Sequence, residues 1–146
     1  MKSSIEWPEL GNIYVTTPEI AINENKTLIN TQPPPQFESS TELESIGLQP
    51  SLANRVTVPL TQLQSELLSI VNSYKDLYYP YRSSDNAEQI RQVYTIHALN
   101  YIFKTRACVM LNTKKIEEEE SKNSGIVFDD IHRDQGLALP HITSAA

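Results

Sequence analysis

The chain has 146 residues, a formal net charge of -6, a hydrophobic content of 39%, nine prolines and four glycines. A chain of this length and composition builds one domain with a modest core, which excludes a large enzyme. No apolar run approaches the roughly 20 residues that span a bilayer, and the N-terminal MKSSIEWPEL has no signal-peptide core, so we expect no membrane partner.

Residues 1–56 predict an extended or disordered, Pro-containing arm without a core of its own. TQPPPQFESSTELES, residues 31–45, has the composition of a polyproline or disordered segment. EWPELGNIYVTTPEIAI, residues 6–22, is too apolar to stay in water, so we expect it to lie on a partner or on the body of the protein. The prolines of QPPPQ are typical of a linker, with a ligand for SH3 or WW domains as the less favoured alternative.

A first amphipathic helix is predicted at about residues 59–78. Either Pro59 lies in its first turn, or Thr61 and Gln64 form a capping box at its start. Pro80 ends the pattern, so we expect the helix to stop near Tyr78. Apolar residues recur at three- and four-residue steps at Leu60, Leu63, Leu67, Ile70, Val71, Tyr74 and Leu77.

A second, longer helix is predicted at about residues 86–118, where Asp85 and Glu88 form a start signal. Its apolar residues cover both sides, so it needs two partners, and we expect Cys108 to be a small buried hydrophobe. The fold class is therefore mainly α: two helices in an antiparallel pair with a largely irregular N-terminal arm and C-terminal tail. The candidate helix-packing interface consists of Tyr94, His97, Tyr101, Ile102 and Phe103.

Three regions follow from this pattern: the arm at 1–56, the helical pair at 57–120 and an irregular tail at 121–146. In the tail, DDIHRD at 129–134 and the nearby His141 could be interpreted as a metal cluster. Such close spacing in a polar segment is more often a solvated loop, so we expect no metal site.

Catalytic chemistry has no support in the sequence. There is no GxxxxGKT phosphate loop, no Gly-rich dinucleotide fingerprint, no GxSxG and no HExxH, and the four glycines are widely scattered. We therefore expect no catalytic, metal or cofactor-binding residues, no cofactor and no small-molecule substrate. The protein is predicted not to be an enzyme.

The middle of the chain offers contacts to RNA or to a protein. Residues 74–115 carry seven basic against three acidic side chains, whereas residues 1–56 carry three basic against seven acidic. The basic residues do not form one stripe along the helix, and tyrosines at helical spacing are more often core or interface groups than base-stacking platforms. A stand-alone helical RNA-binding module using 74–115 remains the alternative function. The candidate RNA or partner contacts are Lys104, Arg106, Lys114, Lys115, Tyr79 and Arg82.

Three segments carry a resemblance: YKDLYYPYR at 74–82, HALNYIFKTR at 97–106 and RDQGLALP at 133–140. In this order and spacing the sequence resembles the digestive organ expansion factor family, nucleolar proteins associated with U-three small nucleolar RNA in the small-subunit processome. KTRACVMLNT departs from the family pattern, because Ala107, Cys108 and Met110 replace charged or polar residues.

The resemblance implies a non-enzymatic ribosome-biogenesis factor that acts in small-subunit pre-rRNA processing within a nucleolar particle. Its implied partners are processome proteins, with pre-rRNA or small nucleolar RNA as further partners, and its implied location is the nucleus and nucleolus. In the family, the segment after DQG leads into a helicase-like domain. The chain is thus expected to be a fragment that ends at the start of that domain, and its long helix is expected to pack on it.

Overall fold

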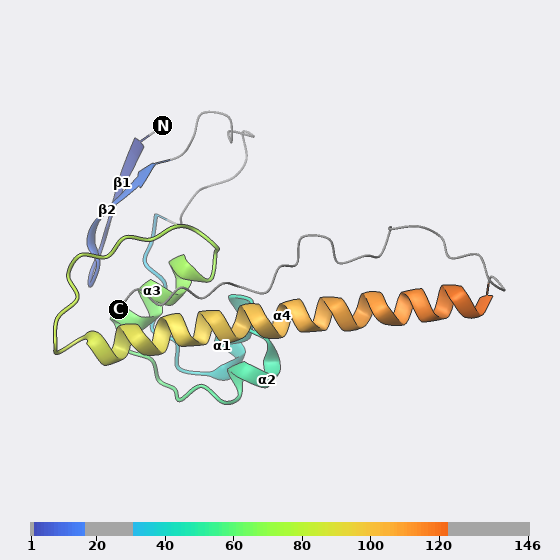
Figure 1. The fold of residues 1–146 in the computed structure, drawn as a ribbon. Helices are drawn as coiled ribbons and strands as arrows, with labels where there is room; N and C mark the ends of the chain where they lie inside the picture. Colours follow the sequence, from blue (N-terminus) through green and yellow to red (C-terminus); the bar gives the residue numbers. More distant parts are fainter. Residues whose placement is uncertain (1, 17–30, 123–146) are drawn as a thin grey trace. The chain divides into compact units, whose positions relative to one another are not determined.

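The computed structural model describes residues 2–16 and 31–122 (Figure 1). Its order of elements is a β-hairpin, three short helices and one long helix. The chain divides into two compact units, Met1–His97 and Ala98–Ala146. The long helix α4 contributes residues to both units. None of the helices in the described ranges is both long and apolar enough to cross a membrane.

The hairpin consists of β1, Lys2–Trp7, and β2, Gly11–Thr16, paired antiparallel with Ile5 opposite Ile13. Gly11 follows the turn with a φ of +64°, a left-handed conformation that glycine adopts without steric cost. The two isoleucines pack against the core of the first unit, whereas Tyr14 on β2 is 80% exposed. This pair of strands corrects the expectation of a largely irregular N-terminal arm.

Two short helices, α1 at Ser40–Ser45 and α2 at Pro50–Ala53, follow the proline-rich segment. A capping box begins α1: the Ser39 hydroxyl accepts from the backbone N–H of Glu42, and the Glu42 carboxylate accepts from the backbone N–H of Ser39. Proline at the first position of α2 has no N–H to leave unsatisfied. The region expected to be irregular therefore contains helices, because capping and proline signals in it start helical turns.

Helix α3, Gln62–Val71, is the first of the two predicted helices. The capping-box alternative is confirmed, since Thr61 and Gln64 exchange both hydrogen bonds and Pro59 lies before the helix. The helix ends at Val71 instead of near Tyr78. Asn72 is its C-cap and donates a side-chain hydrogen bond to the carbonyl of Ile46. Tyr74 has a φ of +58°, which lies outside the range of a right-handed α-helix.

Helix α4, Ala87–Lys122, is the second predicted helix and extends slightly beyond it. Asn86 anchors its start, because its amide donates to the carbonyl of Tyr81 and accepts from the N–H of Ser83. The antiparallel pairing of α3 and α4 is not confirmed. Thr61 donates to Gln89 and Gln64 donates to Gln92, so contacts follow the same order along both helices. The connection at 72–86 is long enough for α4 to begin beside the start of α3.

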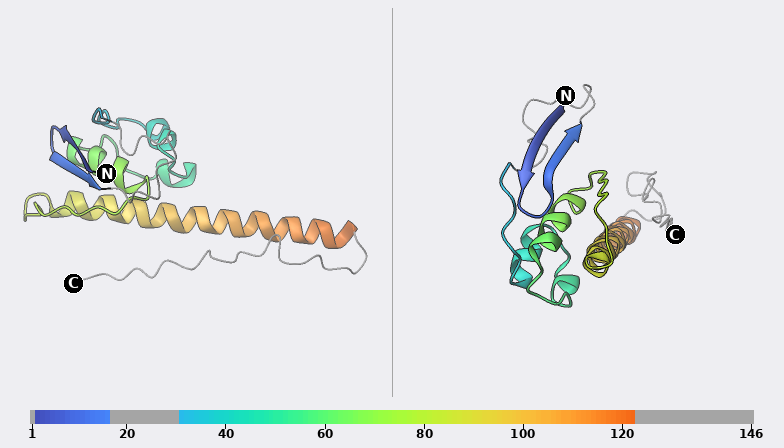
Figure 2. Two further views of the ribbon diagram at one scale, coloured as in Figure 1. Left: turned by 90° about the horizontal axis from the view of Figure 1, so that it is seen from above. Right: turned by 90° about the vertical axis from the view of Figure 1, so that its left-hand side faces the viewer.

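The core of the first unit lies around α3, which the end-on view of Figure 2 shows between α1 and the first turns of α4. Glu66 is fully buried there and accepts hydrogen bonds from the backbone N–H groups of Glu9 and Leu10 at the hairpin turn. Apolar residues 6–22 were expected to lie on a partner or on the body; Trp7, Leu10 and Ile13 lie on the body, whereas Tyr14 is exposed. The core comprises Trp7, Leu10, Phe37, Leu43, Leu48, Leu52, Ala53, Leu60, Leu63, Leu67, Leu68, Ile70, Val93 and Ile96.

Candidate interaction surfaces

The predicted contact residues fall into two groups that belong to different compact units. Tyr79 and Arg82 lie in the connection between α3 and α4, residues 72–86, which we call the tyrosine loop. Lys104, Arg106, Lys114 and Lys115 lie on α4 in the second unit.

Neighbouring tyrosines of the tyrosine loop face opposite environments. Tyr79 packs against the core, and burial, together with the charge of Glu9 and the neighbouring Tyr81, raises the pKa of its phenol. Tyr78 and Tyr81 are 87% and 71% exposed, and the Tyr81 ring meets the edge of the Tyr79 ring with centroids 5.9 Å apart. Tyr79 is the predicted contact residue, whereas Tyr78 and Tyr81 are the exposed tyrosines at this end of the loop.

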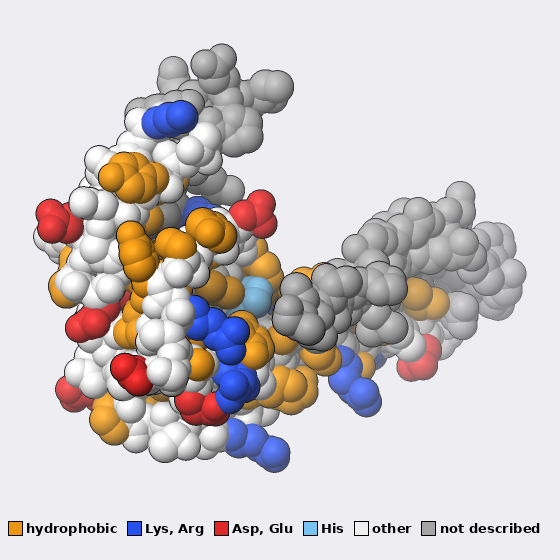
Figure 3. Space-filling model, turned by 60° about the vertical axis from the view of Figure 1, so that its left-hand side comes forward, with side chains coloured by type: hydrophobic (Ala, Val, Ile, Leu, Met, Phe, Trp, Pro, Cys, Tyr) orange, Lys and Arg blue, Asp and Glu red, His pale blue; other side chains and the backbone are white. Residues whose placement is uncertain are grey.

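Charges around the tyrosine loop are balanced. Lys75, Arg82 and Arg91 are matched in number by Asp76, Asp85 and Glu88, and Arg91 pairs with Glu88 on the first turns of α4. Burial lowers the pKa of Lys75. Figure 3 shows hydrophobic and basic side chains side by side on this face of the first unit. Mixed aromatic and arginine surfaces without net charge are typical of protein interfaces.

The candidate helix-packing interface is only partly enclosed. His97 is half-buried and its ring meets the Tyr74 ring edge to face with centroids 5.3 Å apart. This contact joins α4 to the tyrosine loop instead of to α3. Tyr94 is 51% and Phe103 37% exposed, while Tyr101 and Ile102 are half-buried.

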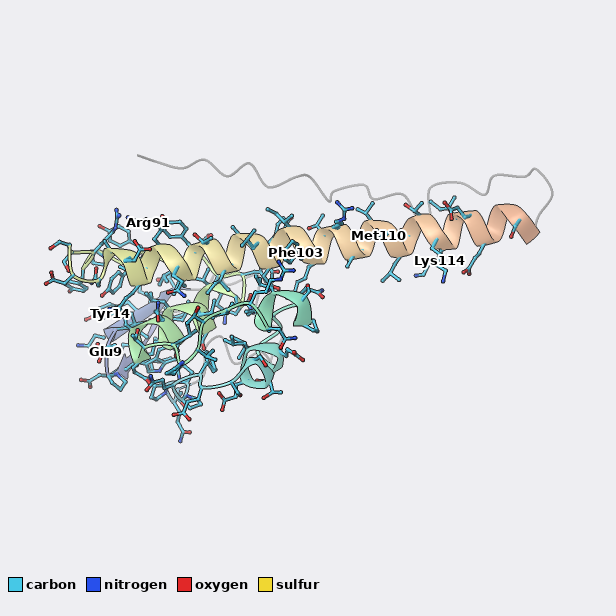
Figure 4. The ribbon with its side chains drawn as sticks, turned by 90° about the horizontal axis from the view of Figure 1, so that it is seen from below. Glu9, Tyr14, Arg91, Phe103, Met110 and Lys114 are labelled. Carbon is cyan, nitrogen blue, oxygen red and sulfur yellow. The ribbon has the colours of Figure 1, made fainter. Side chains whose placement is uncertain are left out.

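In the second unit, α4 carries exposed apolar and basic side chains together. Met110 and Leu111 are 62% and 60% exposed, and Figure 4 shows Phe103, Met110 and Lys114 succeeding one another toward the C-terminal end of the helix. Lys114 forms an exposed pair with Glu118 at 3.8 Å, which contributes little to stability. Arg106 and Lys115 are also exposed, and Lys104 is half-buried.

Cys108 is exposed, so the prediction that it is a buried hydrophobe is wrong. It lies on the part of α4 that the core of the first unit does not include. The sequence contained a signal for this outcome, because the helix has more apolar surface than one partner could cover. The same signal points to Leu111, which is exposed but is not among the predicted contact residues.

A hollow of about 690 Å³ in the first unit is lined by Trp7, Pro33–Pro35, Phe37, Ile70 and Lys75, among others. The Trp7 indole nitrogen has no hydrogen-bond partner among the described residues. Because this nitrogen is buried, it is not accessible to a ligand in the hollow. Across the described ranges, no three His, Cys, Asp or Glu side chains gather in a group that could hold a metal ion. The DDIHRD segment and His141 lie outside the described residues.

Comparison with known proteins identifies the family. The family model "UTP25, NTP hydrolase-like domain" matches residues 74–143, which begin at the tyrosine loop and include all of α4. No solved structure matches the chain.

Curated relatives match more than half of the chain, and the human relative matches nearly all of it. The human U3 small nucleolar RNA-associated protein 25 homolog is 33% identical over 153 residues, covering 94% of this chain. The mouse homolog is 43% identical over 83 residues, which cover 56% of this chain and 10% of that protein. U3 small nucleolar RNA-associated protein 25 of Saccharomyces cerevisiae is 32% identical over 100 residues, which cover 68% of this chain and 13% of that protein. The chain spans only 18% of the length of the human relative. These matches show that the chain belongs to the U3 small nucleolar RNA-associated protein 25 family.

Proposed function

We propose that the chain provides docking surface for a non-enzymatic ribosome-biogenesis factor acting in small-subunit pre-rRNA processing within a nucleolar pre-ribosomal particle. The observation that carries this function is the match to relatives named for association with U3 small nucleolar RNA. The non-enzymatic role is supported by the lack of phosphate-loop motifs in the sequence. The proposed partners are processome proteins together with the U3 or pre-ribosomal RNA.

Two surfaces are available for this docking. The tyrosine loop offers Tyr78, Tyr81 and Arg82, and the second unit offers Arg106, Lys114 and Lys115. Tyrosine and arginine are enriched among the residues that contribute most of the energy of protein interfaces. Both surfaces belong to the proposed helical region, 57–120, which follows the arm at 1–56. We propose that residues 121–146 are the start of a helicase-like domain.

The test is recovery of U3 RNA with the tagged 146-residue chain from cells of its source, measured by quantitative reverse transcription PCR against an unrelated small nucleolar RNA. We expect selective enrichment of U3 RNA and a nucleolar location of the tagged chain by microscopy. Arg82→Glu with Tyr81→Ala should reduce the enrichment several-fold, and Lys2→Glu, an exposed basic residue on β1, should not. Equal recovery of both RNAs would contradict the proposed function.

A salt titration with purified chain and protein-free RNA separates this proposal from a stand-alone RNA-binding module. The module requires affinity that falls steeply with salt, with a contribution to the slope from each phosphate-contacting cation. The balanced charge of the tyrosine loop favours protein docking, for which we expect weak binding to protein-free RNA. Tight, salt-sensitive binding to RNA alone would favour the module instead.

A further inference from the structure

The β-hairpin has two free edges, because β1 and β2 form a sheet of only two strands within the described ranges. The backbone of β2 forms no hydrogen bond with any described segment other than β1. Figure 1 shows the open end of the hairpin, where β2 ends, pointing away from the helices. Alternate residues of β2 therefore direct their N–H and C=O groups toward the outer edge, where a further strand can pair with them.

The two edges of the hairpin differ in how they are protected. β1 carries the charged residues Lys2 and Glu6, and charges on an edge strand oppose the addition of another strand. β2, with the sequence GNIYVT, has no charged residue and no proline. Residues 13–16 of this strand are all of types that are enriched in β-sheets. The edge of β2 is thus open to strand addition, whereas the edge of β1 is guarded.

The two faces of β2 set the chemistry of an added strand. Ile13 packs against the core, and Val15, which lies on the same face, is half-buried. Asn12, Tyr14 and Thr16 are exposed on the other face, where the side chain of Tyr14 is 80% exposed. An added strand must alternate in the same way, with apolar residues toward the body of the unit and polar or aromatic residues toward solvent.

The sequence of β2 itself has this alternation. In an antiparallel alignment of two copies centred on Tyr14, each Tyr14 is opposite the other, Ile13 is opposite Val15, and Asn12 is opposite Thr16. The alignment gives an aromatic pair, apolar pairs and polar pairs across the strands, with no like charges opposed. We infer that β2 pairs with β2 of a second copy of the chain, in a symmetric dimer with one four-stranded sheet.

The geometry of this pairing favours a closed dimer. Antiparallel strands place the two hairpin turns at opposite ends of the four-stranded sheet, so the two bodies do not compete for the same space. Both outer edges of that sheet are β1 strands, whose charges oppose further growth. A partner's peptide would satisfy one free edge, whereas a second copy satisfies the free edges of two hairpins with one ladder. Because only two six-residue strands meet, the interface is small and the dimer is weak.

Sedimentation equilibrium of the 146-residue chain, in a dilution series up to about 1 mM, tests the inference. We expect a reversible equilibrium between monomer and dimer. Tyr14→Lys opposes two like charges at the centre of the pairing and should weaken dimerisation about tenfold or more. Ser4→Lys is the matched control, because it adds the same charge at the exposed residue directly opposite Tyr14 on β1. It should change dimerisation by about twofold or less.

A disulfide cross-link tests the alignment of the two strands. The background is Cys108→Ser, which removes the exposed natural thiol. Directly opposed residues of antiparallel strands have Cα atoms about 4.5 to 5.5 Å apart, a separation that a disulfide can bridge. Tyr14→Cys in this background should therefore form a covalent dimer under mild oxidation. Ser4→Cys in the same background should not.

Three results would overturn the inference. The first is a chain that remains monomeric up to about 1 mM. The second is a dimer that Tyr14→Lys leaves intact and Met110→Glu abolishes, because the exposed side chain of Met110 on α4 would then mediate the contact. The third is equal cross-linking of the Tyr14→Cys and Ser4→Cys variants. Circular dichroism checks that Tyr14→Lys is folded, and if it is not, the cross-linking result decides.

Discussion

The backbone N–H of Leu10 donates a hydrogen bond of 3.0 Å to Oε2 of Glu66, although the two residues are 56 positions apart. The N–H of Glu9 donates to the same oxygen at 3.2 Å, and Gln62 Nε2 donates to Oε1 at 3.0 Å. A buried carboxylate is costly unless its oxygens accept such bonds. Glu66 thereby joins the turn of the hairpin to α3.

We expect Glu66→Ala to destabilise the first unit by about 2 to 4 kcal/mol, because it leaves two backbone N–H groups unsatisfied near a new cavity. Glu66→Gln should cost less, since the amide oxygen still accepts one bond. Urea unfolding monitored by the fluorescence of Trp7, the single tryptophan, measures both. Glu6→Ala, at an exposed position on β1, is the control. Equal stability of the Glu66 and Glu6 variants would contradict the assigned contact.

Removing the cap of α3 should also lower stability. Thr61 Oγ1 accepts from the N–H of Gln64 and donates to Gln89 on α4. Thr61→Val keeps the shape of the side chain and loses both bonds, which should cost about 1 kcal/mol or more in the free energy of unfolding. Thr61→Ser keeps the hydroxyl and should recover most of that loss. A Val variant as stable as the Ser variant would show that the cap is not formed.

Glu42 links the stability of the first unit to pH. Hydrogen bonds from the backbone N–H groups of Glu38 and Ser39 lower the pKa of its carboxyl group. A carboxylate with a lowered pKa in the folded state stabilises it above the ordinary pKa, and this contribution is lost as the pH falls through the lowered value. As the pH falls from about 7 to about 3, the free energy of unfolding of the Glu42→Gln variant should therefore decrease less than that of the unmodified chain. Urea midpoints that fall equally with pH in the variant and the unmodified chain would contradict this prediction. Glu44→Gln on the same helix is the control.

Cys108 should react with a thiol reagent in the folded protein. Because its side chain is exposed, we expect Ellman's reagent to titrate one thiol per chain without denaturant. The rate should be close to that in urea. A reaction that requires denaturant would restore the interpretation of Cys108 as a buried residue.

Local signals in the sequence predicted α3 and α4, but not α1 and α2 in the arm expected to be irregular. The capping pair Thr61 and Gln64 defines the start of α3, and the long segment without proline or glycine forms α4. Such signals act within one or two turns, so they can be read without the rest of the fold. The apolar excess of α4 also predicted that one partner would not cover it, in agreement with the exposure of Met110 and Leu111.

Interactions between distant residues decided the remainder. The sequence by itself determined where α3 and α4 start and that α4 has an apolar excess. Only the tertiary structure decided that α3 ends at Val71 and that Tyr79 turns inward while Tyr78 and Tyr81 face solvent. The Asn72 bond to Ile46 and the Glu66 bonds to the hairpin turn join segments far apart along the chain. No local pattern encodes these pairings, because the energy of each bond depends on which distant groups folding brings within reach.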